Sequence, residues 1–172
     1  MKKSNKEQTL GRGSALEVSS MQMTPKKSGT IFADKSICHG CGICELVCSL
    51  SHSGACDPAL SNIRLLRDPL AGEFLIETCR QCDFPGCYFS CPYGAIVIEP
   101  KTGARVIDGE RCEGCGSCSK ACPFNERGTI VKPDPEKGIY LKCDLCMGLG
   151  RGPLCVEACP LCALSHIPAA ER

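Results

Sequence analysis

The sequence predicts an α+β fold of two tandem units, one nested inside the other, in which short hairpins and helical turns surround groups of cysteines. Three observations carry this prediction. Eighteen of the 172 residues are cysteine, and sixteen of them fall into four runs of four. A unit of ligand loop, helical turn and hairpin repeats between the runs. Tryptophan is absent and aromatic residues make up 5%, so metal–thiolate bonds must supply much of the folding free energy.

The third run, Cys112 to Pro123, indicates the chemistry. Its spacing, C-x2-C-x2-C-x3-C-P, is typical of bacterial [4Fe–4S] ferredoxins. Three thiolates on one tight loop reach three irons of a cubane, and Gly114 and Gly116 permit the left-handed backbone that such a loop needs. The fourth cysteine follows on a helical turn and ligates the other cluster of a pair. The sequence therefore predicts ferredoxin-like units and four [4Fe–4S] clusters.

The stretches between the runs predict the secondary structure. They are short, rich in β-branched residues and bounded by Pro, Gly and Asp. The glycine-rich insert at 147–154 is expected to be a surface loop. We expect strands at 31–33, 62–66, 73–77, 95–98, 104–107, 129–132 and 139–141, and a helical turn at 45–50.

The N-terminal residues differ from the rest in being polar, basic and without periodicity. We expect a flexible arm there. An alternative is an arm that docks on a partner subunit through Leu16, Val18, Met21 and Met23. The predicted division of the chain is an arm at 1–30, an outer unit at 31–78 and 126–166, an inner unit at 79–125, and a C-terminal tail at 167–172.

Crossed ligation assigns four cysteines to each cluster. Within a two-cluster unit the fourth cysteine of each run crosses to the partner cluster. Only a hairpin separates runs two and three, so they form one unit, and runs one and four pair across the chain ends. The predicted sets are Cys79, Cys82, Cys87 and Cys122; Cys112, Cys115, Cys118 and Cys91; Cys38, Cys41, Cys44 and Cys159; and Cys143, Cys146, Cys155 and Cys48.

The four runs resemble those of the four-cluster iron–sulfur subunits of molybdopterin and tungstopterin oxidoreductases, including the dimethyl sulfoxide reductase, formate dehydrogenase and polysulfide reductase types. The resemblance covers residues 31–166 and rests on the second run, C-x2-C-x4-C-x3-C-P, and on the fourth, which has eight residues between its second and third cysteines. It implies the same crossed pairing. The first run, with Ser49 after its fourth cysteine, is most similar to the branch that accompanies tungsten-dependent aldehyde oxidoreductases.

The resemblance implies an electron-transfer subunit with no catalytic centre of its own. Its clusters would form a wire between a large catalytic Mo/W pterin-type subunit and a second redox partner such as a flavoprotein or ferredoxin. Copies could also stack head to tail if clusters lie near both ends. The alternative is a free-standing polyferredoxin, or an electron adaptor for a hydrogenase or flavoprotein.

Composition and spacing argue against other classes. A disulfide scaffold is disfavoured because the cysteines come as C-x-x-C groups, whose thiols converge on one point. A zinc protein is disfavoured because the runs supply three or four cysteines within about eleven residues, whereas zinc sites usually come as two separated pairs. No window is long and apolar enough to span a membrane, and no secretory or twin-arginine signal is present, so we expect a cytoplasmic location unless a partner carries an export signal. Sixteen thiolates and four oxidised cores would change the net charge from +1 to about −7, and no basic stripe suggests nucleic acid.

Five further side chains, two cysteines and three histidines, could in principle bind a metal. Cys56 and Cys162 are surplus to the four runs, and we interpret them as small buried or partly buried thiols; the alternative is a substitute ligand or a redox-sensitive thiol. His39 lies inside the first run but is not needed as a ligand, and His52 and His166 are expected to be structural or solvated. No nucleophile elbow or nucleotide-binding loop occurs.

Overall fold

The computed structural model describes residues 26–171. Within that range the chain forms eight short strands and four α-helices, together with three single turns of 3-10 helix. This confirms the predicted α+β class with short hairpins and helical turns. The anchor residues proposed for a docking arm lie outside the described range, so that role stays a prediction.

The strands pair into four separate two-stranded antiparallel sheets. Three of these are local hairpins, and the fourth joins the two ends of the described chain. The pairs are β1 (Thr30–Ala33) with β8 (Leu164–Ile167), β2 (Ile63–Asp68) with β3 (Glu73–Thr78), β4 (Ile96–Ile98) with β5 (Arg105–Ile107), and β6 (Lys132–Pro133) with β7 (Tyr140–Leu141).

Each α-helix begins inside a cysteine run, and the third cysteine of the run is its second residue. All four of these cysteines are buried. One helical turn later, four residues on, comes the fourth cysteine. The helices are α1 (Ile43–Ser53), α2 (Gly86–Ser90), α3 (Ser117–Ala121) and α4 (Leu154–Glu157), and the 3-10 turns are η1 (Pro58–Leu60), η2 (Met147–Leu149) and η3 (Ala169–Glu171).

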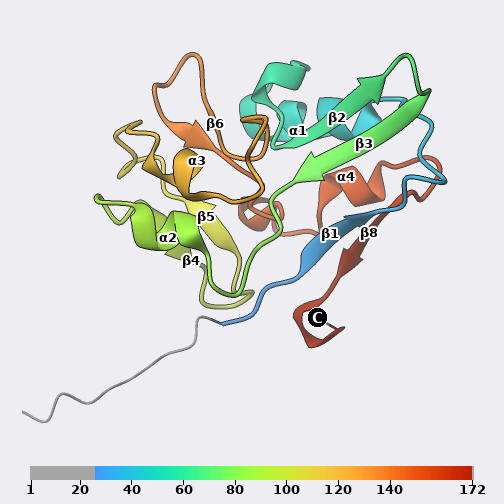
Figure 1. Ribbon diagram of the computed structural model, residues 1–172. Coiled ribbons are helices and arrows are strands. Elements are labelled where there is room, and N and C mark those ends of the chain that lie inside the picture. Colours follow the sequence, from blue (N-terminus) through green and yellow to red (C-terminus); the bar gives the residue numbers. More distant parts are fainter. Residues whose placement is uncertain (1–25, 172) are drawn as a thin grey trace, which may run out of the picture.

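The helices pack in two pairs. Helix α2 contacts α3, and α1 contacts α4. Figure 1 places α2, α3 and the β4–β5 hairpin on one side of the molecule, and α1, α4, the β2–β3 hairpin and the β1–β8 pair on the other. The buried core joins the two sides, with cysteines interleaved between aliphatic residues such as Ile63, Ile96 and Val131.

Three details differ from the predicted elements. Helix α1 is longer than the predicted turn and ends where Gly54 adopts the left-handed conformation. Strand β8 was not predicted, because its four residues carry no clear alternation. The strand predicted at 129–132 is wrong except at its end: Asn125 Oδ1 accepts hydrogen bonds from the N–H groups of Ile130 (2.8 Å) and Val131 (3.0 Å), so these groups are not available to a partner strand.

All four cysteine loops turn at the same position, the residue before the second cysteine. That residue has a positive φ in every run: 69° at Gly40, 50° at Gln81, 64° at Gly114 and 59° at Leu145. Glycine adopts this conformation without steric cost, whereas other residues are strained by it. The predicted role of Gly114 in folding its loop therefore agrees with the backbone, and two runs achieve the same turn without glycine.

Replacing Gly114 with alanine should damage its loop more than the φ angle alone explains. A Cβ there would lie 2.1 Å from the carbonyl oxygen of Gly138, whereas a Cβ on Gly128, which has a similar φ of 68°, would meet nothing within 4 Å. Both variants carry left-handed strain of about 1–2 kcal/mol. We expect Gly114→Ala to lower the melting temperature and the iron content well below those of Gly128→Ala, measured by calorimetry and iron analysis. Equal losses in the two variants would contradict this.

Candidate metal centres

Two cavities on the α2–α3 side are each lined by one predicted cysteine set. One is lined by Cys79, Cys82, Cys87 and Cys122, and the other by Cys91, Cys112, Cys115 and Cys118. In each case three cysteines come from one run and the fourth from the helix of the other run. The packing of α2 against α3 produces this exchange, because each helix ends at the cavity that the other helix begins.

The other two sets are formed around α1 and α4. Burial, and then the charges of Cys143, Cys48, Cys146 and Cys44, raise the pKa of Cys155. The first three of these cysteines and Cys155 lie close together. These four are the predicted set that combines run four with the last cysteine of run one. Cys48 reaches it from α1, which packs against α4.

The remaining set gathers the first three cysteines of run one. Burial and then the charges of Glu45, Cys41 and Cys38 raise the pKa of Cys44 to about 11. Cys159 follows α4 and packs, half-buried, against the core. Its place as the fourth member of this set stays a prediction.

Backbone N–H groups point at the sulfur atoms of several cysteines. Asn62 donates to Cys48 Sγ over 3.3 Å and Ala95 donates to Cys91 Sγ over 3.3 Å, so the fourth cysteines of runs one and two share this feature. Two first cysteines are contacted in the same way, Cys79 by Gln81 N at 3.5 Å and Cys112 by Tyr140 N at 3.4 Å. Hydrogen bonds to sulfur stabilise thiolate charge and raise the potential of an iron–sulfur cluster.

Burial raises the pKa of several of the thiols. It raises the pKa of Cys143 to about 12 and that of Cys87 to about 11. A buried thiolate is costly unless positive charge offsets it. The iron atoms of a cubane supply such charge, so these closely grouped, largely apolar sulfur sets fit [4Fe–4S] clusters.

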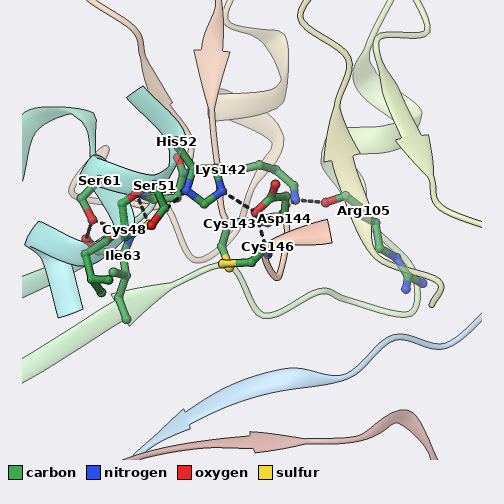
Figure 2. A network of polar contacts seen from close by, with 12 residues as sticks. Cys48, Ser51, His52, Ser61, Ile63, Arg105, Lys142, Cys143, Asp144 and Cys146 are labelled. Carbon is green, nitrogen blue, oxygen red and sulfur yellow. Dashed lines mark hydrogen bonds and ion pairs between the residues drawn. The ribbon is translucent and has the colours of Figure 1, made fainter. Parts of the chain in front are cut away.

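His52 joins α1 to the fourth run. Its Nδ1 lies 2.9 Å from the carbonyl oxygen of Cys48, and its Nε2 lies 3.0 Å from Asp144 Oδ1 (Figure 2). The contact with Asp144 raises the pKa of His52 to about 11. His52, Asp144 and Cys146 could together hold a single metal ion, but Cys146 is also a member of a predicted cluster set. The expectation of a structural role for His52 agrees with these contacts.

A buried polar group that the sequence did not predict lies where the fourth run meets the inner hairpin. It consists of Gln81, Arg105 and Lys142, which are 0%, 0% and 3% exposed. The sequence held one indication of this group: Gln81 precedes the second cysteine of its run, a position that glycine occupies in runs one and three. The buried state of Arg105 and Lys142 has no signature in the sequence.

The surplus residues lie at the surface. Cys56 and Cys162 are exposed, so the prediction that they are buried or partly buried was wrong. Cys56 lies in the loop between α1 and η1, and Cys162 lies in a turn before β8 with a φ of 52°, so neither reaches the core. His39 and His166 are also exposed. Arg151 of the predicted surface insert pairs with Glu157 over 2.7 Å.

Comparison with known proteins agrees with the cysteine pattern. Residues 70–167 match the model of the 4Fe-4S dicluster domain. The chain is 42% identical over 123 residues to the polyferredoxin-like subunit of an aliphatic sulfonate oxidoreductase from Pyrococcus furiosus, covering 71% of this chain and 66%, just under two thirds, of that one. It is 35% identical to the electron transport protein HydN of Escherichia coli K12 over 78% of this chain and 85% of that one. It is 34% identical to YnfG, the probable anaerobic dimethyl sulfoxide reductase chain of the same strain, over 81% and 73%.

The chain belongs to the 4Fe-4S dicluster family of ferredoxin-like electron-transfer proteins. Its eighteen cysteines and the matched domain support four [4Fe–4S] clusters as its cofactors. Such a cluster, when bound, accepts and releases one electron. Among residues 26–171 no helix has the length and apolar character needed to cross a membrane.

Iron should leave the holo-protein faster as the pH falls. Burial raises the pKa of Cys143 to about 12 and those of Cys44 and Cys87 to about 11, so a sulfur that loses its iron takes up a proton at any lower pH. Protons therefore compete with iron for these sulfurs, and acid favours release. We expect the rate of iron transfer to a chelator to rise from pH 9 to pH 6, followed anaerobically by visible absorption. A rate that is constant or rises with pH would contradict this.

Proposed function

We propose that this chain is the electron-transfer subunit of an oxidoreductase complex and conducts electrons through four [4Fe–4S] clusters between a catalytic subunit and a second redox partner. The observation that carries the proposal is the exchange of fourth cysteines between the two cavities on the α2–α3 side. Cys122 lines the run-two cavity and Cys91 lines the run-three cavity. Crossed ligation of this kind is the signature of paired clusters.

Contacts between sets support a linear order of clusters. The run-three and run-two sets are joined by the α2–α3 pair. The charge of Cys79 acts on Cys143, and the charge of Cys44 acts on Cys155. The helix packing and these electrostatic influences favour the order run three, run two, run four and run one, with the inner unit nested within the outer one. The chain's part is to hold neighbouring sets close enough for an electron to pass between them.

The sixteen proposed ligands favour conduction over catalysis on this chain. Each set provides one cysteine for every iron of a cubane, so no iron is left with an open position for a substrate. The catalytic centre is therefore assigned to a partner subunit.

The partner that the relatives favour is a pterin-type oxidoreductase. YnfG is a probable dimethyl sulfoxide reductase chain, which agrees with the resemblance of the four runs to that family. The relative from Pyrococcus furiosus serves an oxidoreductase of aliphatic sulfonates. The idea of a tungsten-dependent, aldehyde-oxidising partner rests on the first cysteine run alone. The names of YnfG, HydN and the relative from Pyrococcus furiosus mention neither tungsten nor an aldehyde. The similarity to HydN, an electron transport protein, supports the alternative of an adaptor that serves several enzymes.

Ligand substitutions test the cluster sets. We expect Cys79→Ser and Cys143→Ser each to disturb one cluster, with loss of up to four of about 16 iron atoms per chain and an altered spectrum after low-temperature reduction. Cys56→Ser and Cys162→Ser are the matched controls, because both residues are exposed and outside the sets. Full iron content in Cys79→Ser, or loss of a cluster in either control, would refute the assignment. A colourless zinc-containing protein would refute the function as well.

Affinity capture tests the partner. The tagged chain, purified anaerobically from its native cells, is expected to retain a large pterin-containing subunit in native mass spectrometry. Capture of several different enzymes in small amounts would favour the adaptor instead. Head-to-tail stacking predicts more than one copy per complex, and a strictly single copy would exclude it.

A further inference from the structure

Lys142 lies buried at the junction of the two sides of the molecule. Its Nζ donates hydrogen bonds to the carbonyl oxygens of Arg105 and, over 2.8 Å, of Cys143 (Figure 2). Gln81 Nε2 donates to the same two oxygens, over 3.4 Å to Arg105 and 2.8 Å to Cys143, while Gln81 Oε1 accepts from Arg105 N at 2.7 Å. An ammonium and an amide thus share two acceptors, which fixes the ammonium in place.

Lys142 makes no ion pair within the described part of the chain, although Asp134 and Asp144 line the same cavity. His52, by contrast, has Asp144 as its counter-charge. A buried ammonium without an opposite charge is unfavourable, since carbonyl dipoles replace only part of its hydration. The compensating negative charge must come from another source.

The nearby thiols identify that source. Lys142 Nζ binds the carbonyl oxygen of Cys143 and that of Arg105, and Arg105 lines the same cavity as Cys87 and Cys122. Cys87 and Cys122 belong to the run-two set and Cys143 to the run-four set. Lys142 therefore faces the two sets at the middle of the proposed order, and their thiolates supply the charge that it lacks.

We propose that Lys142 is a fixed positive charge shared by the run-two and run-four clusters, which raises the reduction potentials of these two above the values that they would otherwise have. The proposal rests on the ligand sets given under the proposed function. Reduction adds one negative charge to a cluster, and a nearby cation in a site of low dielectric constant stabilises the added charge. The cavity of the run-three set is lined by neither Lys142 nor Arg105, and the two acceptors of the Lys142 ammonium include no residue of run one or run three.

Arg105 is a second buried cation at one of these sets and has to be kept constant in the test. It lines the run-two cavity, and its guanidinium donates to the carbonyls of Lys26, Gly103 and Asp83. Its influence is expected on the run-two cluster. A change made at Lys142 alone, with its effect on the run-four cluster followed, separates the two cations.

The test is an anaerobic potentiometric titration of the complete holo-protein, monitored by electron paramagnetic resonance. Lys142→Gln removes the charge but keeps a hydrogen-bond donor, and Lys142→Arg keeps the charge. Exposed Lys101→Gln is the control for the same change in net charge. We expect Lys142→Gln to reduce the equilibrium constant for reduction of two clusters at least tenfold, which is about 59 mV for a one-electron couple. Lys142→Arg and Lys101→Gln should leave all four potentials near those of the wild type.

Iron and sulfide analysis of each sample separates the failure of this proposal from failure of the proposed function. Wild-type protein without four clusters would refute the function itself. With four clusters present, unchanged potentials in Lys142→Gln, or equal shifts of all four clusters, would overturn the role of Lys142. Loss of clusters from both Lys142→Gln and Lys142→Arg would also overturn it, because Lys142 would then be required for assembly whatever its effect on potential.

Discussion

The structure depends on the convergence of four sulfur atoms on one point. A left-handed residue before the second cysteine turns each loop, and a helix that begins beside the third cysteine leads to the fourth. On the α2–α3 side this fourth cysteine lines the cavity of the other run. The helices and strands are short because each has only to connect one group of cysteines to the next. The hairpins then cover the loops, and every sheet within residues 26–171 has two strands.

This constraint also explains the composition of the core. Cysteines occupy positions that aliphatic residues fill in most proteins of this size, and the buried aliphatic residues lie between them. Burial of so many thiols opposes their ionisation, as the raised pKa of Cys143 shows. Iron supplies the positive charge that this interior needs, which couples metal binding to folding.

The fold class and the inner pair of cysteine sets could be predicted from sequence, because ligand spacing fixes them directly. The hairpins at 63–78 and 96–107 also followed from their turns. Strand β8 and the Asn125 contacts could not be predicted, since both depend on partners distant in sequence or on a side chain that replaces a strand. The exposure of Cys56 and Cys162 was missed because thiol composition alone favours burial.

Two of the four runs have a residue other than glycine immediately before the second cysteine, and these are the two runs in the middle of the proposed order. Runs one and three, at the ends of the proposed order, have Gly40 and Gly114, whereas runs two and four have Gln81 and Leu145. A left-handed non-glycine residue costs of order 1–3 kcal/mol and persists where the surroundings require its side chain. Gln81 uses that side chain to bind the carbonyl of Cys143, and Leu145 is buried in the core. Left-handed strain therefore occurs where the side chain is needed for packing or hydrogen bonding, and glycine occurs where a close neighbour, Phe74 at Gly40 or the Gly138 carbonyl at Gly114, leaves no room for a Cβ.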